Sequence, residues 1–343
     1  MEQSVKPSSS VIEISVVVPV RDEEDSIRAL LYGLFRQTLP PTEIVITDNG
    51  SIDATADIVE EIIHSGAPII LIREKAGLPG RGRNLAVAQA RYDWIAFIDA
   101  GNKPATDWLE ALARKASENP AVDVVYGTYE PVVDSFFKEC AAFAYVPPPS
   151  ESDGGLVRPR SIVSALMRRR VWETVGGFPE DLRSAEDLLF MRRVEQAKCN
   201  IVRTSEAVVY WNIQPNLWRT FRRFVAYSHN NIRAGLFAEW QALIFLRYAS
   251  IAVAIVPAFF LSSRWLLVPL VLWLLFMILR ATKALRRNRQ SYPASHARNL
   301  ARLCLLVPII ATLDAAAFFG SINWFLGDKL GLTRSRGQDE SQG

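Results

Sequence analysis

The stretch Trp94-Ile95-Ala96-Phe97-Ile98-Asp99-Ala100-Gly101-Asn102 is an apolar run that ends at a carboxylate and then becomes polar. A short run without polar residues predicts a strand covered on both faces, as in parallel sheets. Ligands of such sheets bind beyond the carboxyl ends of the strands, which is where Asp99 would lie. An aspartate in this place also stabilises turns, so Asp99 by itself leaves both a ligand-binding and a structural role open.

Three apolar runs precede this stretch, and each is followed by a polar loop and a helical pattern. The runs cover residues 11–20, 43–47 and 69–73. Strands and helices that alternate at this spacing predict an α/β fold with a doubly wound, mainly parallel, Rossmann-like sheet. Asp48 and Asp99 would both lie at carboxyl ends of strands, with Asp22 near the end of another. Three carboxylates could therefore converge on one crevice.

Asp22 has a second interpretation, because it can cap the helix predicted over residues 27–34. Glu23 and Glu24 would then suit the first turn of that helix, where the dipole favours acids. Further on, Glu186 and Asp187 open a predicted helix, and helix-opening acids are common for the same reason. More strands are predicted over residues 121–129, 161–167 and 208–211, and a basic, aromatic helix over 218–233.

The composition changes after Trp240, where apolar residues concentrate into long runs. The sequence predicts a disordered tail over 1–11, an α/β domain over 12–235, a membrane region over 236–327 and a second tail over 328–343. Within the membrane region we expect a helical hairpin of 241–263 and 265–279, a basic loop over 280–302, and a third apolar segment over 303–326. Arg247 interrupts the first arm, and neither uninterrupted apolar run reaches the roughly 20 residues of a membrane span without its flanks.

The segment 280–302 contains arginine and lysine but no acid. By the positive-inside rule it lies in the cytoplasm, so the α/β domain is expected at the cytoplasmic face of the inner (plasma) membrane. Such a basic segment argues against the alternative of buried core helices in a soluble protein. Asp314 marks either a buried polar contact or a helix at the interface, and the basic tail with Arg334 and Arg336 favours an interfacial or re-entrant course.

The overall composition excludes several classes of function. The formal net charge is only +3, and no nucleic acid is expected as a partner. The three cysteines, Cys140, Cys199 and Cys304, are odd in number and lack the spacing of a zinc site. A disulfide framework is therefore not expected.

Five motifs occur in a fixed order between residues 12 and 235. They are Val17-Val18-Pro19-Val20-Arg21-Asp22-Glu23-Glu24, Thr47-Asp48-Asn49-Gly50-Ser51-Ile52-Asp53-Ala54-Thr55, Gly82-Arg83-Asn84, Phe97-Ile98-Asp99-Ala100, and Gly176-Gly177-Phe178 with Glu186-Asp187. Each motif alone is weak, but in this order they resemble the family 2 glycosyltransferases of the GT-A fold. The resemblance implies inverting transfer of a sugar from a nucleotide-diphosphate sugar to an acceptor hydroxyl.

The resemblance also implies residue roles for donor binding. Asp48 would accept the N–H of the base, although an Asx turn is the structural alternative. Pro19 and Asp22 would flank the base and ribose, and Asp99 would bind on the ribose or metal side. Arg83 would face the diphosphate, which guanidinium groups bind well, whereas a merely solvated basic loop is the alternative.

For the acceptor side, the resemblance places the catalytic base at Asp187, with Glu186 as its neighbour or as an acceptor ligand. Trp211, Arg222 and Arg223 would contact the acceptor or the diphosphate, although a helix that holds its arginines at a bilayer surface is equally compatible. The Gln-x-x-Arg-Trp signature of processive synthases is absent there. Transfer of one sugar is therefore favoured over a processive polysaccharide synthase.

The metal motif of the family, Asp-x-Asp, is incomplete in this chain, because Gly101 stands at its second acid. Asp99, with Asn102 as a further ligand, could hold Mn²⁺ or Mg²⁺ together with phosphate oxygens. Alternatively, arginines neutralise the leaving diphosphate. Gly101 also supports a rival interpretation as a non-catalytic sugar-nucleotide sensor or scaffold. A site held near a bilayer favours a lipid-linked acceptor, and a soluble saccharide stays open.

Overall fold

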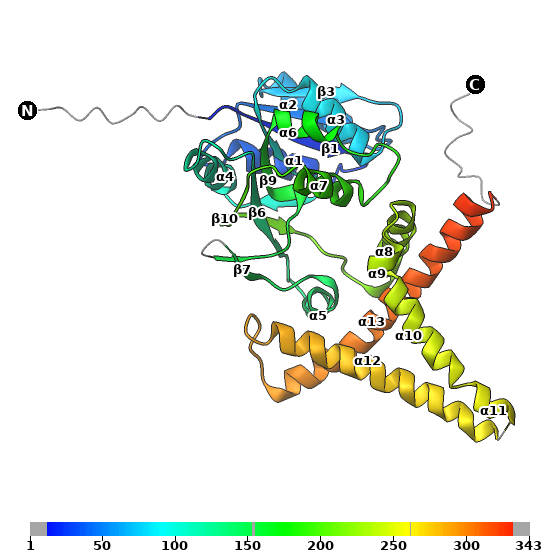
Figure 1. The fold of residues 1–343 in the computed structure, drawn as a ribbon. Coiled ribbons are helices and arrows are strands. Elements are labelled where there is room, and N and C mark those ends of the chain that lie inside the picture. Colours follow the sequence, from blue (N-terminus) through cyan, green and yellow to red (C-terminus); the bar gives the residue numbers. More distant parts are fainter. Residues whose placement is uncertain (1–11, 153–154, 261, 332–343) are drawn as a thin grey trace, which may run out of the picture. The chain divides into compact units, whose positions relative to one another are not determined.

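The computed structural model describes residues 12–152, 155–260 and 262–331 (Figure 1). The tail predicted over 1–11 and most of the tail predicted over 328–343, including Arg334 and Arg336, lie outside the described residues. The chain divides into two compact units, which are described separately. Of the described residues, the first unit comprises those within 12–130, 149–181 and 187–211, and the second comprises those within 131–148, 182–186 and 212–331.

The first unit is built on an eight-stranded sheet of order β3-β2-β1-β4-β9-β6-β10-β5. Its strands are β1 (Ile14–Val20), β2 (Glu43–Asp48), β3 (Ile69–Arg73), β4 (Trp94–Phe97), β5 (Asn102–Pro104), β6 (Val124–Pro131), β9 (Ala165–Arg168) and β10 (Ile201–Trp211). Strands β3, β2, β1 and β4 are mutually parallel, whereas β9 runs antiparallel to both β4 and β6. The predicted α/β fold is confirmed, but beyond β4 the sheet is mixed and not mainly parallel.

Both faces of the parallel part are covered by helices. These helices are α1 (Ile27–Phe35), α2 (Thr55–His64), α3 (Pro79–Gln89), α4 (Trp108–Ser117), α6 (Arg169–Val175) and α7 (Glu186–Gln196). All seven residues of β1 are buried, and its side chains alternate between two core clusters. Val16 and Val18 pack with Trp108 in one cluster, and Val17 packs with Phe97 in the other. This is the burial on both faces that the apolar runs predicted.

Several boundaries differ from the sequence predictions. Helix α1 begins at Ile27 after Ser26, so Asp22 does not cap it. Instead Asp22 has a left-handed φ of 55°, which turns the chain between β1 and α1. Strand β10 is 11 residues long and begins at Ile201, well before the predicted 208. Two short strands that were not predicted, β7 (Ser150–Ser152) and β8 (Gly155–Val157), pair antiparallel between the strands predicted over 121–129 and 161–167.

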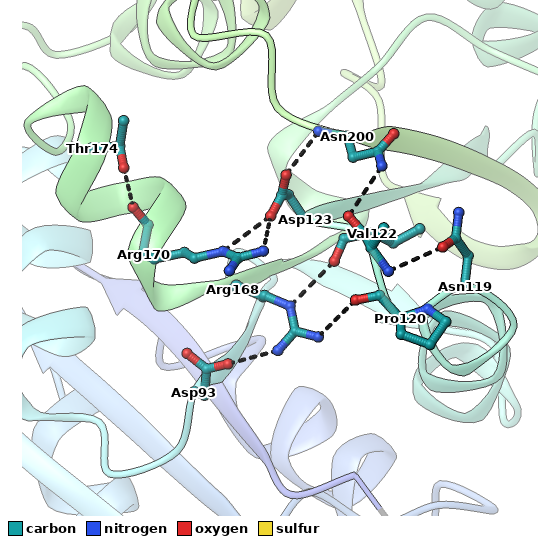
Figure 2. A network of polar contacts seen from close by, with 10 residues as sticks. Asp93, Asn119, Pro120, Val122, Asp123, Arg168, Arg170, Thr174 and Asn200 are labelled. Carbon is teal, nitrogen blue, oxygen red and sulfur yellow. Dashed lines mark hydrogen bonds and ion pairs between the residues drawn. The ribbon is translucent and has the colours of Figure 1, made fainter.

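A polar network stabilises the edge of the sheet at which β4 and β6 begin (Figure 2). Arg168 donates to Asp93 Oδ2 at 2.9 Å and to the carbonyl of Val122 at 3.2 Å. Asp123 accepts from Arg170 Nη2 at 2.6 Å and from the backbone N–H of Asn200 at 2.9 Å. Since β4 starts at this edge and runs toward Asp99, the network stabilises the end of the strand away from the candidate site.

The second unit is helical. Its helices are α5 (Phe136–Tyr145), α8 (Leu217–Arg233), α9 (Phe237–Trp240), α10 (Ala242–Val253), α11 (Val256–Phe260), α12 (Leu267–Asn288) and α13 (His296–Trp324). Helices α10 and α12 form the arms of a hairpin with α11 at its tip (Figure 1). By length and composition, two helical segments are apolar enough to cross a membrane, Arg264–Asn288 and His296–Lys329. The segment 280–302, expected as a loop, is helical as far as Asn288 and again from His296.

Ion pairs hold the helices of the second unit together. Glu139 of α5 pairs with Arg298 Nη2 at 2.5 Å and also with Arg302, both from α13. Asp314 of α13 is 1% exposed and pairs with Arg280 of α12 at 2.5 Å. Of the two alternatives for Asp314, the structure therefore shows the buried polar contact.

Candidate functional site

Asp48 is the last residue of β2 and lies opposite Val20 of β1 in the register of the sheet. Its carboxylate is almost fully buried, and Oδ1 accepts hydrogen bonds from Ser51 N at 2.9 Å and Ser51 Oγ at 2.6 Å. Asp48 therefore makes a local turn contact of the kind that was the structural alternative, although the bonded N–H is three residues on and not two as in an Asx turn. This contact fixes the carboxylate at the carboxyl edge of the parallel strands.

The loop that follows β1 is joined to the loop that follows β2. Asp22 N donates to Ser51 Oγ at 2.9 Å, and Ile52 N donates to Asp22 Oδ1 at 2.9 Å. In the same way Ala54 N, at the start of α2, donates to Glu24 Oε2 at 3.0 Å. The side chains of Asp22 and Glu24 thus satisfy backbone donors of the neighbouring loop.

Two glycines, Gly77 before α3 and Gly82 in its first turns, pack against a buried amide. Asn49, next to Asp48, is 3% exposed, and a Cβ added at either Gly77 or Gly82 would come within 2.5 Å of its side chain. Only glycine allows this close approach. Asn49 was part of a quoted motif, but its packing against residues 28 and 33 positions further on has no local sequence signal.

Arg83 of α3 and Asp99 after β4 form an ion pair, with Nη2 and Oδ1 2.7 Å apart. The arginine is 3% exposed and its guanidinium carbon lies 5.5 Å from the centre of the Phe178 ring. The Asp99 side chain keeps a third of its surface exposed. The structure thus places Arg83 as a buried partner of Asp99 and places Asp99 where a ligand can reach it.

Asn84, to which the motifs gave no role, connects α3 to the turn at Gly177. Its Oδ1 accepts from Trp172 Nε1 at 2.9 Å and from Phe178 N at 2.8 Å. Its Nδ2 donates to the carbonyl of Phe178 at 2.9 Å and to Glu180 Oε1 at 2.8 Å. The Gly82-Arg83-Asn84 and Gly176-Gly177-Phe178 motifs are therefore two halves of one contact.

The ring of Phe178 carries this contact toward α7. It stacks on Phe190 of α7 at a centroid distance of 3.8 Å and lies 5.6 Å from the ring of Phe97 in β4. Asp187 stands at the start of α7, and its Oδ1 accepts from Leu188 N at 2.8 Å. The aromatic stack thereby fixes the helix of the predicted base against the strand that delivers Asp99.

The residue before this acid pair has an unusual backbone. Ala185 is buried and has a φ of 71°, in the left-handed region that alanine rarely adopts. Glu186, which follows it, is 4% exposed. A strained residue directly before two carboxylates is typical of functional sites.

The end of β4 meets β5 and β10 at the same edge. Asn102 lies opposite Trp211 in the β5–β10 register, and its Nδ2 donates to the backbone carbonyl of Asp99 at 3.2 Å. The Trp211 ring packs edge-on against Tyr129 with centroids 6.2 Å apart. The structure thus brings together Asp99, Asn102 and Trp211.

Gly101 has a φ of 82°, so an aspartate there would need a left-handed conformation. A Cβ added at Gly101 would lie 3.6 Å from Glu23 Oε2. The described residues contain no group of three or more acids, histidines or cysteines that could bind a metal. The exposed Asp99 carboxylate and the Asn102 amide oxygen fit an ion that takes its other ligands from a bound diphosphate and water.

Arg222 and Arg223 lie on α8 in the second unit. Arg222 is exposed to solvent. Arg223 Nε donates to Tyr227 Oη at 2.6 Å, one turn along the same helix. Their roles toward an acceptor or a diphosphate stay predictions.

A comparison with models of protein families matches residues 15–175 to Glycosyl transferase family 2. This part of the chain is a family 2 glycosyltransferase domain. The match includes Pro19, Asp22, Asp48, Arg83 and Asp99, whereas Asp187 and Trp211 lie beyond it.

Curated relatives carry a similar domain. EpsJ of Bacillus subtilis, named an uncharacterized glycosyltransferase, is 27% identical over 205 residues, which are 54% of this chain and 58% of EpsJ. The succinoglycan biosynthesis protein ExoA of Rhizobium meliloti is 27% identical over 257 residues, which are 71% of this chain and 76% of ExoA. The chain thus spans little more than half the length of EpsJ.

One solved structure has a fold similar to that of this chain. The mannosyltransferase PcManGT of Pyrobaculum calidifontis, in complex with GDP-Man and Mn²⁺, has a TM-score of 0.53 and 20% sequence identity. The alignment covers 96% of this chain and 91% of PcManGT. The expected GT-A architecture is therefore confirmed.

Proposed function

We propose that the protein is an inverting glycosyltransferase that moves one sugar from a nucleotide-diphosphate sugar to an acceptor hydroxyl. The observation that carries this proposal is that Asp48 and Asp99 lie at the same edge of the sheet. The rings of Phe97, Phe178 and Phe190 pack together and hold the helix that carries Asp187 against this part of the sheet. In a family 2 domain, this arrangement supplies groups for the donor and a base for the acceptor.

The reaction needs a base because an acceptor hydroxyl is a poor nucleophile. In our proposal Asp187 takes the hydroxyl proton while the oxygen attacks the anomeric carbon, and the bond to the nucleotide diphosphate breaks on the opposite face. Glu186 is its neighbour or binds the acceptor. Attack opposite the leaving group inverts the anomeric configuration.

On the donor side, Asp48 accepts the N–H of the base, while Pro19 and Asp22 flank the base and ribose. Asp99 binds on the ribose or metal side, and Arg83 acts by positioning Asp99. A divalent cation, Mn²⁺ or Mg²⁺, held by Asp99 and Asn102 would neutralise charge on the leaving diphosphate.

We further propose that transfer takes place at the cytoplasmic face of the inner membrane with a lipid-linked acceptor. Two helical segments long and apolar enough to cross a bilayer, and the basic residues between 280 and 302, support this location. Trp211, Arg222 and Arg223 are the residues we assign to the acceptor or the diphosphate. ExoA, a succinoglycan biosynthesis protein, is consistent with a role in envelope polysaccharides.

Nucleotide release tests the proposal. The purified chain is incubated with a panel of sugar nucleotides and membrane lipid extract, and released nucleotide diphosphate is measured for the wild type and for Asp187→Asn. We expect the variant to lose about 10²- to 10⁴-fold in rate because the base is gone. Asp181→Asn, an exposed acid six positions earlier, is the matched control and should keep the wild-type rate.

Three results would contradict the proposal in different ways. A wild type that binds nucleotide but releases none from any donor would be a sensor and not an enzyme. An unchanged rate in Asp187→Asn would show that another group is the base. Products that carry many sugars on one acceptor would indicate a processive synthase.

A further inference from the structure

A polar cluster lies among the apolar helices of the second unit. Asp314 Oδ2 of α13 accepts from Arg280 Nη1 of α12 at 2.5 Å and from Tyr248 Oη of α10 at 3.2 Å. Trp273 Nε1 donates in turn to Tyr248 Oη at 3.2 Å. Three helices therefore converge on one carboxylate that is 1% exposed. Ionisable groups among apolar helices are costly and usually mark a function.

The cluster has more positive than negative groups. The guanidinium carbons of Arg247 and Arg280 lie 5.1 Å and 5.6 Å from the centre of the same Phe276 ring. Arg280 pairs with Asp314, but Arg247 has no carboxylate within ion-pair distance among the described residues. The two guanidinium charges repel each other, and the apolar surroundings screen this repulsion little. An anion beside Arg247 would offset the repulsion.

The cluster also contains an acceptor without a donor. Asp314 Oδ1 is buried and has no hydrogen-bond partner among the residues that the structure describes. Buried polar atoms are nearly always hydrogen-bonded. A ligand that carries both a phosphate and a hydroxyl would satisfy Arg247 and Asp314 together.

An apolar groove of about 510 Å³ begins at Phe318, one helical turn after Asp314 on α13. Phe245 of α10 and Phe318 and Ile322 of α13 contribute to its wall, and its volume lies within the roughly 300–1,000 Å³ of ligand pockets. The Phe318 ring lies 4.4 Å from Phe245 and 5.1 Å from Tyr248 between centroids. Tyr248 therefore touches both the groove wall and the buried carboxylate.

We propose that the cluster and the groove together bind one membrane phospholipid. Its phosphate lies beside Arg247 and Arg280, a headgroup hydroxyl donates to Asp314 Oδ1, and an acyl chain fills the groove. The arms of the hairpin support this occupant because their apolar side chains are exposed on the protein, as for Leu246 at 67% and Leu270 at 58%. A phosphate with a hydroxyl-bearing headgroup is the chemistry of phosphatidylglycerol. This site does not depend on the transfer reaction.

Native mass spectrometry of the full chain in detergent tests the proposal. Phosphatidylglycerol, phosphatidylcholine and inorganic phosphate are titrated separately, and the bound fraction is measured. We expect one tightly bound phosphatidylglycerol and weaker phosphatidylcholine, since choline lacks a hydroxyl. Arg247→Gln should weaken phosphatidylglycerol binding about tenfold because a charge-assisted contact is lost. Arg264→Gln, which removes the same charge from an exposed position at the hairpin tip, should bind as the wild type does.

A second variant separates the lipid from a free anion and does not alter the charges. Ile322→Trp fills part of the groove from a half-exposed position and should weaken phosphatidylglycerol binding while the protein stays folded. Displacement of the lipid by millimolar inorganic phosphate, with no effect of Ile322→Trp, would show a free-anion site and overturn the proposal. Equal binding of both lipids by the wild type and Arg247→Gln would overturn it as well.

Discussion

Arg83 Nη2 and Asp99 Oδ1 are 2.7 Å apart, and this ion pair joins α3 to the end of β4. The arginine is buried and the carboxylate is partly exposed. The packing around Arg83 therefore fixes the position of the Asp99 carboxylate. A fixed carboxylate at the end of a strand can bind a ligand without first losing side-chain entropy. We therefore expect Arg83 to act as a positioning residue for Asp99.

Arg83→Gln tests this relationship. The change removes the charge that pairs with Asp99, and we expect the free energy of unfolding to fall by about 1–3 kcal/mol because buried charged hydrogen bonds are lost. Nucleotide affinity should fall as well, since Asp99 is no longer held. Urea unfolding and nucleotide titration measure the two effects.

Arg81→Gln is the control for this variant. Arg81 lies two residues earlier and pairs with Glu74 and Glu180, but its side chain is 42% exposed. An exposed pair of this kind contributes about 0–1 kcal/mol. Equal effects of the two substitutions would contradict the positioning role of Arg83.

The contact made by Asn84 gives a second prediction. Asn84→Ala would remove the acceptor of the Trp172 and Phe178 N–H groups and leave these donors without their partner. We expect a loss of about 2 kcal/mol in the free energy of unfolding. Asn119→Ala, which removes one exposed hydrogen bond to Ala121 N, should cost clearly less in the same urea experiment. A smaller loss for Asn84→Ala than for Asn119→Ala would refute this role.

The parallel half of the fold was predictable because its signals are local. The apolar runs that end at Asp48 and Asp99 determine both the strands and the edge at which the carboxylates lie. That these strands are buried on both faces can be predicted from the apolar run alone, without knowledge of the rest of the chain. The mixed half was not predictable in this way, because β5 is three residues long and pairs with β10 about a hundred residues later.

The contacts within the site were harder to predict than its residues. Arg83 belonged to a recognised motif, but its burial against Asp99 and Phe178 depends on segments far away in the sequence. Asp22 seemed suited to cap its own helix, whereas its left-handed φ directs the carboxylate to Ile52 N. Likewise, the basic segment 280–302 contains no acid, yet Glu139 and Asp314 from other helices pair with three of its arginines.

The network at the opposite edge of the sheet predicts a pH dependence (Figure 2). Burial tends to raise the pKa of Asp123, but the N–H of Asn200 and the guanidinium of Arg170 outweigh it and lower the pKa below the ordinary value. A lowered pKa means that Asp123 contributes stability above the pKa of about 3.9 of the unfolded chain and loses it as the pH falls through the folded value.

Asp123→Asn should therefore unfold at a lower temperature than the wild type at pH 7, and the difference should shrink steadily below about pH 4. Thermal unfolding between pH 3 and pH 8 measures it. Asp107→Asn serves as the control, at an exposed acid that forms no ion pair with any residue the structure describes. A difference that stays constant over the whole pH range would refute the linkage.

The incomplete metal motif gives the last prediction. In the proposed function Asp99 and Asn102 would supply few ligands, so the remaining coordination would come from the diphosphate of the donor and from water. We expect activity to depend on Mn²⁺ or Mg²⁺ but to saturate only at high metal concentration, and EDTA to abolish it. Full activity after EDTA treatment would show that arginines alone neutralise the leaving group.

Gly101→Asp restores the missing acid of the metal motif, and its effects on stability and on Mn²⁺ affinity can be measured separately. Because Gly101 has a φ of 82°, the substitution should lower the free energy of unfolding by about 1–2 kcal/mol. The new carboxylate would lie near Glu23. Together with Asp99, it should bind Mn²⁺ more tightly than Asp99 does without it, in the presence of a nucleotide diphosphate. Electron paramagnetic resonance of free Mn²⁺ measures this affinity directly. An unchanged Mn²⁺ affinity in a folded variant would mean that position 101 does not face the metal. The second acid of the Asp-x-Asp motif would then have no counterpart at this position.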